Sequence, residues 1–182
     1  GDNNIAITGA LSGGDGGLFG AGGGGGLNPG LGANGIIIII YEPLTVTAAT
    51  TGTQTATMEV SATNQSVGGA FSFVSAAPLS ITSITITEGG TIDASTNLDN
   101  IKLYYENDTS NPYDCASESL SSPSSPTESQ FGSTDTDGFS AANGTATFSG
   151  SVSINSTSTM CVYTVLDVGA GASADQTIEI SL

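Results

Sequence analysis

Cationic residues are almost absent from this sequence. The chain has no histidine, and Lys102 is its only base against 17 acids in 182 residues. A nucleic-acid interface needs clustered Lys and Arg to release counterions from phosphates, so nucleic acid is excluded as a partner. The usual general bases, activated nucleophiles and zinc ligands also have no residues to be built from. We therefore expect no enzyme and no bound cofactor, with calcium as the one ion left to consider.

Long apolar runs are missing too. No stretch approaches the ~20 residues that span a bilayer, so we expect no membrane insertion. Charged residues make up 10% of the chain, against about 25% in ordinary globular proteins. Serine and threonine provide the polar surface instead, a profile typical of extracellular β-proteins. We expect an extracellular or cell-surface location and, since no signal peptide is visible, a processed form.

Cysteine occurs only twice, at Cys115 and Cys161. In an extracellular protein, one disulfide between the two is the natural expectation. The alternative is a pair of buried free thiols.

Acceptor sequons for N-glycosylation are the commonest motif. Each consists of Asn, any residue but Pro, and Ser or Thr, and such motifs favour turns and strand ends where a glycan can be tolerated. A chain this rich in Ser and Thr also produces them by chance. The predicted sites are Asn64, Asn107, Asn143 and Asn155.

Glycine dominates residues 1–35, for example at Gly22–Gly26. Because glycine loses the most backbone entropy on ordering, this arm cannot form a conventional helix or strand by itself. One interpretation is a flexible linker. The other is an extended arm whose glycine backbone packs closely with other chains in an assembly.

Five consecutive isoleucines, Ile36, Ile37, Ile38, Ile39 and Ile40, follow the glycine-rich arm. Such β-branched residues suit a strand buried on both faces. Left exposed, the same strand would template aggregation, so it must be covered. Residues 36–43 are then either the first strand of a sandwich domain over residues 36–182, or a strand donated to another subunit.

Alternating apolar and polar residues predict about eight strands, separated by turns such as one at Gly52. The segment 107–143 contains three prolines and is expected to be a long surface excursion with little regular structure. The pattern predicts an all-β, antiparallel two-sheet sandwich. The expected strands cover residues 44–47, 54–60, 68–74, 80–87, 101–105, 145–154, 160–168 and 176–182.

Residues 44–182 contain several short motifs that occur together in one order. The motifs are Thr-Gly-Thr-Gln-Thr-Ala (51–56), Thr-Ile-Asp-Ala (91–94), Leu-Asp-Asn-Ile-Lys-Leu-Tyr-Tyr (98–105), Asp-Cys-Ala-Ser-Glu-Ser (114–119), Gln-Phe-Gly-Ser-Thr (130–134) and Met-Cys-Val-Tyr-Thr-Val-Leu-Asp-Val (160–168). With these motifs the segment resembles immunoglobulin-like modules of large bacterial surface proteins, which often adjoin glycine-rich stretches. The resemblance implies an extracellular immunoglobulin-like sandwich, a Cys115–Cys161 bridge and no known catalysis.

Two further motifs carry candidate chemistry. Asp135 and Asp137 precede Gly138 with the spacing that opens many calcium loops, but no distal Glu follows, which favours an ordinary Asx turn. Lys102 could form an amide bond with an asparagine only if it were buried and deprotonated, and it alternates away from the apolar residues Ile101 and Leu103.

The leading hypothesis is a structural subunit of an extracellular filament or surface layer that binds copies of itself. An extended segment can complete a neighbour's open sheet, and head-to-tail repetition of that contact generates a fibre. The alternative is an adhesin or carbohydrate-binding module, for which Tyr104, Tyr105 and Tyr113 are the candidate stacking residues.

Overall fold

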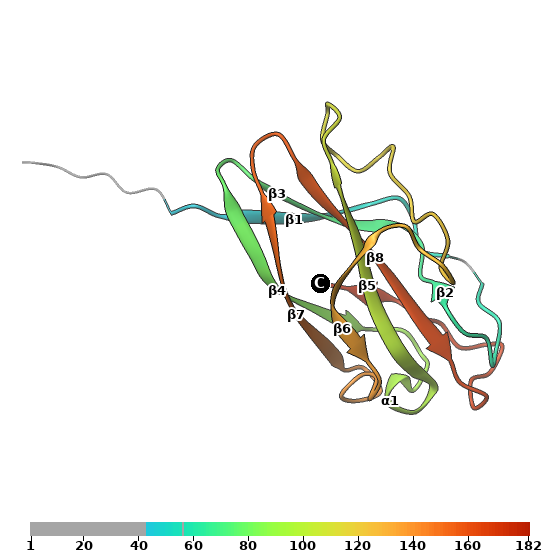
Figure 1. Ribbon diagram of the computed structural model, residues 1–182. Helices are drawn as coiled ribbons and strands as arrows, with labels where there is room; N and C mark the ends of the chain where they lie inside the picture. Colours follow the sequence, from blue (N-terminus) through green and yellow to red (C-terminus); the bar gives the residue numbers. More distant parts are fainter. Residues whose placement is uncertain (1–42, 56) are drawn as a thin grey trace, which may run out of the picture. The chain divides into compact units, whose positions relative to one another are not determined.

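The computed structural model describes residues 43–55 and 57–182. The predictions for the glycine-rich arm 1–35 and for Ile36–Ile40 lie outside the described residues. Within them the chain forms nine strands and one short helix, and Leu44–Leu182 is a compact unit (Figure 1). The elements are β1 (Val46–Thr51), β2 (Gln65–Ser66), β3 (Ala70–Ser75), β4 (Leu79–Glu88), α1 (Ala94–Asn97), β5 (Leu98–Asp108), β6 (Ser129–Asp135), β7 (Thr145–Ile154), β8 (Thr159–Val168) and β9 (Ile180–Ser181).

Two antiparallel sheets form a β-sandwich. The larger sheet has the order β1-β3-β8-β5-β6, with β2 also paired to β8, and the smaller sheet has the order β7-β4-β9. All pairings are antiparallel. The coarse fold prediction is therefore confirmed.

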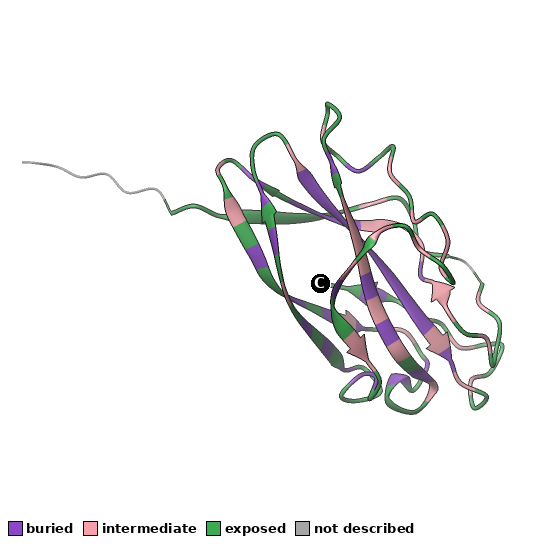
Figure 2. Ribbon diagram, viewed as in Figure 1, coloured by how far each residue is buried: buried purple, intermediate pink, exposed green. Residues whose placement is uncertain are grey.

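Alternation along the strands explains the core between the sheets. In β4, Ile84 and Ile86 are buried while Thr85 is exposed, as the sequence predicts. In β5, Ile101 and Leu103 are fully buried and pack in the same core cluster as the β4 isoleucines. Figure 2 shows this banding of buried and exposed residues along the strands.

Strand β8 is buried on both of its faces. Val162 and Leu166 belong to the main core, whereas Cys161 and Tyr163 join a second apolar cluster with Cys115. Leu120 packs against this second cluster. The segment between β5 and β6 therefore covers part of the outer face of the larger sheet.

Three sequence predictions were wrong in detail. The segment 107–143, expected to have little regular structure, contains an unpredicted strand, β6 (Ser129–Asp135), which pairs with β5 around the buried Phe131. The described residues of the segment 54–60, which are 54, 55 and 57–60, do not form a strand, and they make only side-chain and isolated backbone contacts. The last strand is confined to Ile180–Ser181 because only Thr87 and Glu88 of β4 pair with it.

The turn expected at Gly52 is present. Gly52 follows β1 with a φ of 76°, a left-handed conformation that residues with a Cβ disfavour. Gly132 in β6 has the same conformation, with a φ of 74°, and a Cβ there would also lie 2.7 Å from the Ser149 carbonyl oxygen of β7. The two sheets approach each other closely at this point.

Candidate functional site

A disulfide joins Cys115 to Cys161, which are 46 residues apart in the sequence, as predicted. Cys161 lies within β8, and Cys115 lies in the segment between β5 and β6. Both are buried with Tyr163. The bond therefore ties a long connection to the central strand of the larger sheet.

Polar contacts around the disulfide were not anticipated from the sequence. Asp108 is 2% exposed, and its carboxylate accepts hydrogen bonds from the Ser110 N–H at 2.8 Å and the Cys115 N–H at 3.1 Å. The hydroxyl of Thr159 donates to the carbonyl of Tyr113. An acid at the end of a strand, seven residues before a cysteine, was the available signal.

Tyr163 lies between the disulfide cluster and an acidic side chain. Its hydroxyl donates to Glu106 Oε1 at 2.6 Å. Burial, followed by the hydrogen bond and charge of Glu106, raises the pKa of the Tyr163 phenol well above its ordinary range. The phenol is therefore a fixed neutral donor at physiological pH.

Glu128 lies at the end of the segment that connects β5 to β6, directly before β6. Partial burial raises the pKa of its carboxyl, but hydrogen bonds from the Ser121 hydroxyl and from backbone N–H groups outweigh this effect and lower it. The carboxylate accepts from both the N–H and the hydroxyl of Ser121 at 2.8 Å.

The predicted calcium ligands form a turn. Asp135 Oδ1 accepts from the N–H groups of Asp137 at 3.0 Å and Gly138 at 3.1 Å. These contacts are those of an Asx turn. No group of three or more His, Cys, Asp or Glu residues within residues 43–55 and 57–182 could hold a metal ion. Calcium binding at Asp135 and Asp137 stays a prediction.

The four sequons differ in exposure. Asn107, Asn143 and Asn155 are exposed, and Asn64 is half-buried. Asn155 Oδ1 accepts from both the N–H and the hydroxyl of Thr157. The first and last residues of this sequon are therefore hydrogen-bonded to each other at the turn between β7 and β8. Occupancy of all four sites stays a prediction.

The side chain of Lys102, the only basic residue in the sequence, binds a neighbouring loop. Its Nζ donates to Asn64 Oδ1 at 2.7 Å. Asp167 supports the same loop, because its Oδ1 accepts from the Asn64 N–H at 2.6 Å. Lys102 is half-buried, so its ammonium is not in the apolar setting that an amide bond to asparagine would need.

The candidate stacking tyrosines do not form one platform. Adjacent strand residues point to opposite faces of a sheet, and Tyr105 packs edge-on against Phe131 with ring centroids 6.4 Å apart. Tyr104 lies opposite Tyr163 of β8 instead. An open cavity of about 310 Å³ is nevertheless lined by Tyr105, Glu106 and Glu128.

Strand β1 is the most exposed regular element. Residues 46–50 are all exposed, and Val46 and the preceding Leu44 retain 38% and 56% of their accessible surface. In the described part of the chain, β1 pairs with β3 alone. The opposite edge of β1 is therefore unpaired by any described strand.

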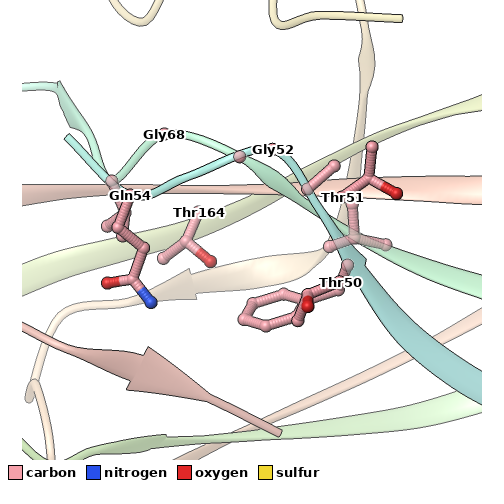
Figure 3. Close-up of a pocket in the computed structure, with 11 residues that line it drawn as sticks. Thr50, Thr51, Gly52, Gln54, Gly68 and Thr164 are labelled. Atoms are coloured by element: carbon pink, nitrogen blue, oxygen red, sulfur yellow. The ribbon is translucent and has the colours of Figure 1, made fainter. Parts of the chain in front are cut away.

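A cavity of about 200 Å³ opens at the end of β1 (Figure 3). Thr50 and Gln54 line it together with Phe71 and Thr164. The hydroxyl of Thr164 is buried and has no hydrogen-bond partner among the described atoms. The cavity therefore joins the exposed face of β1 to the core between the sheets.

Among the described residues, no helix is long and apolar enough to cross a membrane.

Comparisons with protein-family models, with curated proteins and with solved structures found no match to this chain. The resemblance to immunoglobulin-like surface modules therefore stays an expectation from the sequence, and a function has to rest on the geometry described above.

Proposed function

We propose that this protein is a non-catalytic structural subunit of an extracellular filament or surface layer, assembled from copies of itself. The sandwich, with immunoglobulin-like connections, serves as the body of the subunit. The N-terminal segment, including the glycine-rich arm 1–35 and Ile36–Ile40, serves as the connecting element.

One observation carries this proposal: exposed apolar side chains gather where the described body joins the N-terminal segment. Of the five large apolar residues exposed among the described positions, Leu44 and Val46 lead into and begin β1, and Val74 lies opposite Thr47 in the neighbouring β3, on the other face of the sheet from Val46. The other two, Val60 and Leu182, lie outside β1 and β3. Exposed apolar surface of this kind marks interaction sites. Ile36–Ile40 follows the same rule, because five isoleucines need a cover.

The distribution of charge along the chain also favours a contact near β1. The formal net charge is -16, yet no charged residue occurs between Pro43 and Met58. Copies that approach through this uncharged region keep most carboxylates away from the contact. The disulfide supports an extracellular setting, where such bonds persist.

Negative-stain microscopy of the purified full chain tests the proposal. We expect fibres or sheets, favoured at low pH or by divalent cations because both reduce repulsion among the 17 carboxylates. Light scattering at pH 3 and pH 8 in low salt measures the effect. Monodisperse particles under all these conditions would contradict the proposed function.

A carbohydrate-binding module is the second candidate. The cavity lined by Tyr105, Glu106 and Glu128 favours it, because an aromatic ring beside hydrogen-bonding carboxylates suits a sugar. Binding of the full chain to a glycan array, compared with that of the Tyr105→Ala variant, tests this candidate. Binding that the variant loses would support an adhesin instead of a purely structural subunit.

A further inference from the structure

We propose that the free edge of β1 is the acceptor for Ile36–Ile40 of a second copy, which adds to the larger sheet as a further strand. This inference rests on the proposed function and names the surface at which the copies meet. It identifies β1, Val46–Thr51, as the receiving strand and a second copy of this chain as the partner.

The structure of β1 suits strand addition. Its six residues pair with β3 in an unbroken register from Val46 opposite Ser75 to Thr51 opposite Ala70. It contains no proline and no charged residue, and its register with β3 contains no bulge. Prolines, charged residues and bulges are the devices by which proteins normally protect a sheet edge from pairing with another chain. The edge of β1 has none of them.

The outer edges of β6 and β7 protect each other. The backbone of β6 lies against that of β7 where Gly132 meets Ser149. The ring of Phe131 also lies so close to Gly150 that a Cβ there would be 2.7 Å from it. A further strand cannot add at this corner of the sandwich without displacing one of the two.

The outer edge of β9 is capped by a side chain. Gln54 Nε2 donates to the Ile180 carbonyl at 2.7 Å, and the Ile180 N–H donates to Gln54 Oε1 at 3.1 Å. The side-chain amide thus takes the place of a neighbouring strand. Of the end strands β1, β6, β7 and β9 in the order of the two described sheets, β1 is the one left without such protection.

The side chains next to β1 provide a surface for alternate residues of an added strand. Phe71 and Phe73 of β3 are buried, and they lie directly opposite Thr50 and Ala48 of β1, which are exposed. Residues that are directly opposite share a face of the sheet. The core-facing side of β1 is therefore uncovered, and it leads to the cavity floored by Phe71 and Thr164.

The chemistry of Ile36–Ile40 fits this edge. Ile36–Ile40 and β1 are both uncharged and rich in β-branched residues, so pairing the two segments brings no two carboxylates together. In strand addition, main-chain hydrogen bonds supply affinity, and surfaces for alternate side chains supply specificity. Alternate isoleucines would cover Val46 and Ala48 on the core-facing side.

The path of the chain favours a second copy over pairing within one chain. Leu44 and Thr45 are exposed, and they run into β1 along its own direction (Figure 1). To pair Ile36–Ile40 with its own β1, the chain would have to reverse within residues 41–45. A neighbouring copy needs no such reversal, and residues 41–45 then connect the donated strand to its own β1.

Cross-linking of full-length variants tests the partner. Protein carrying Ile38→Cys is mixed with isotope-labelled protein carrying Ala48→Cys or Ala49→Cys, and a short bis-maleimide is added. The native cysteines are bonded to each other, so they do not react. We expect peptides that join residue 38 of one chain to residue 48 or 49 of the other, found by mass spectrometry.

Edge variants test the same surface by assembly rate. Ala48→Asp places a charge on β1, and Ser151→Asp places the same charge on an exposed position of β7. We expect Ala48→Asp to slow fibre growth at least tenfold with an unchanged circular dichroism spectrum, and Ser151→Asp to grow like the parent protein.

The possible results separate this inference from the proposed function. If Ile38→Asp stops assembly but Ala48→Asp does not, the proposed function stands and β1 is not the acceptor. Cross-links only between two β1 strands would also overturn the inference. If the full chain forms no assemblies and yields no cross-link between chains, both fail together.

Discussion

The side chain of Gln54 pairs with the backbone of Ile180 as a neighbouring strand would, through one donated and one accepted hydrogen bond. The contact joins residues 126 positions apart in the sequence. It satisfies the outward-facing N–H and C=O of the short strand β9, which would otherwise be open to another chain. Gln54 therefore stabilises the fold and protects an edge.

Replacing Gln54 with Ala should destabilise the protein by about 1–2 kcal/mol, because two hydrogen bonds are lost. The uncovered edge of β9 should also increase non-specific association. Chemical denaturation measures the first effect, and light scattering of freshly purified monomer measures the second. Gln65→Ala is the control, since the Gln65 side chain in β2 donates only to the carbonyl of Thr63, two residues earlier; equal losses in the two variants would contradict the role assigned to Gln54.

Thr164→Val should stabilise the protein by about 1 kcal/mol, because the change removes a buried hydroxyl that has no partner among the described atoms. Thr159→Val, on the same strand, should be destabilising, since the buried Thr159 hydroxyl donates to the Tyr113 carbonyl. Thermal unfolding of both variants provides the comparison. A loss of stability in Thr164→Val would indicate that its hydroxyl binds something essential in the cavity.

Removing the disulfide with the double variant Cys115→Ser and Cys161→Ser should cost roughly 4 kcal/mol, given the loop that the bond closes in the unfolded chain. For a domain of this size we expect a fall in Tm of roughly 10 °C. Calorimetry measures the change. Two free thiols in the unreduced parent protein, detected by mass spectrometry, would contradict the bond itself.

Tyr163 should make stability depend on pH in the alkaline range. The pKa of the phenol is raised in the folded state, so its contribution is complete below the ordinary phenol pKa of about 10 and is lost as the pH rises above it. Tyr163→Phe should be less stable at pH 8, because the bond to Glu106 is lost, and the difference from the parent should shrink between pH 10 and pH 12. Tyr104→Phe is the control; a difference that stays constant for Tyr163→Phe would contradict the assignment.

The sequence predicted the fold where side chains alternate without interruption. The strand 145–154 was predicted to the residue because Ala146, Phe148, Val152 and Ile154 follow the period of a half-buried strand. Strand β6 escaped prediction because Phe131 is its only large apolar residue, and the serines and prolines before it resemble a loop. Its position depends on pairing with β5, a contact between distant residues that local pattern does not contain.

The surface proposed for assembly was also predictable from the sequence only in part. The need to cover Ile36–Ile40 follows from residue type alone, since β-branched runs do not stay exposed. The acceptor does not follow, because β1 is an edge only through its place beside β3 in the larger sheet. The hydrogen bonds of Gln54 to β9 could not be predicted either, since the residues around Gln54 have the pattern of an ordinary threonine-rich strand.

The N-terminal segment as the connecting element is the central claim, and microscopy of matched variants tests it most directly. The full chain is compared with a variant lacking residues 1–35 and with the full-length double variant Ile38→Asp and Ile40→Asp, all checked by circular dichroism. We predict fibres or sheets from the full chain, and folded, monodisperse particles from both variants. Fibres of unchanged form from the variant lacking residues 1–35 would contradict the account and move the contact to the faces or other edges of the sandwich.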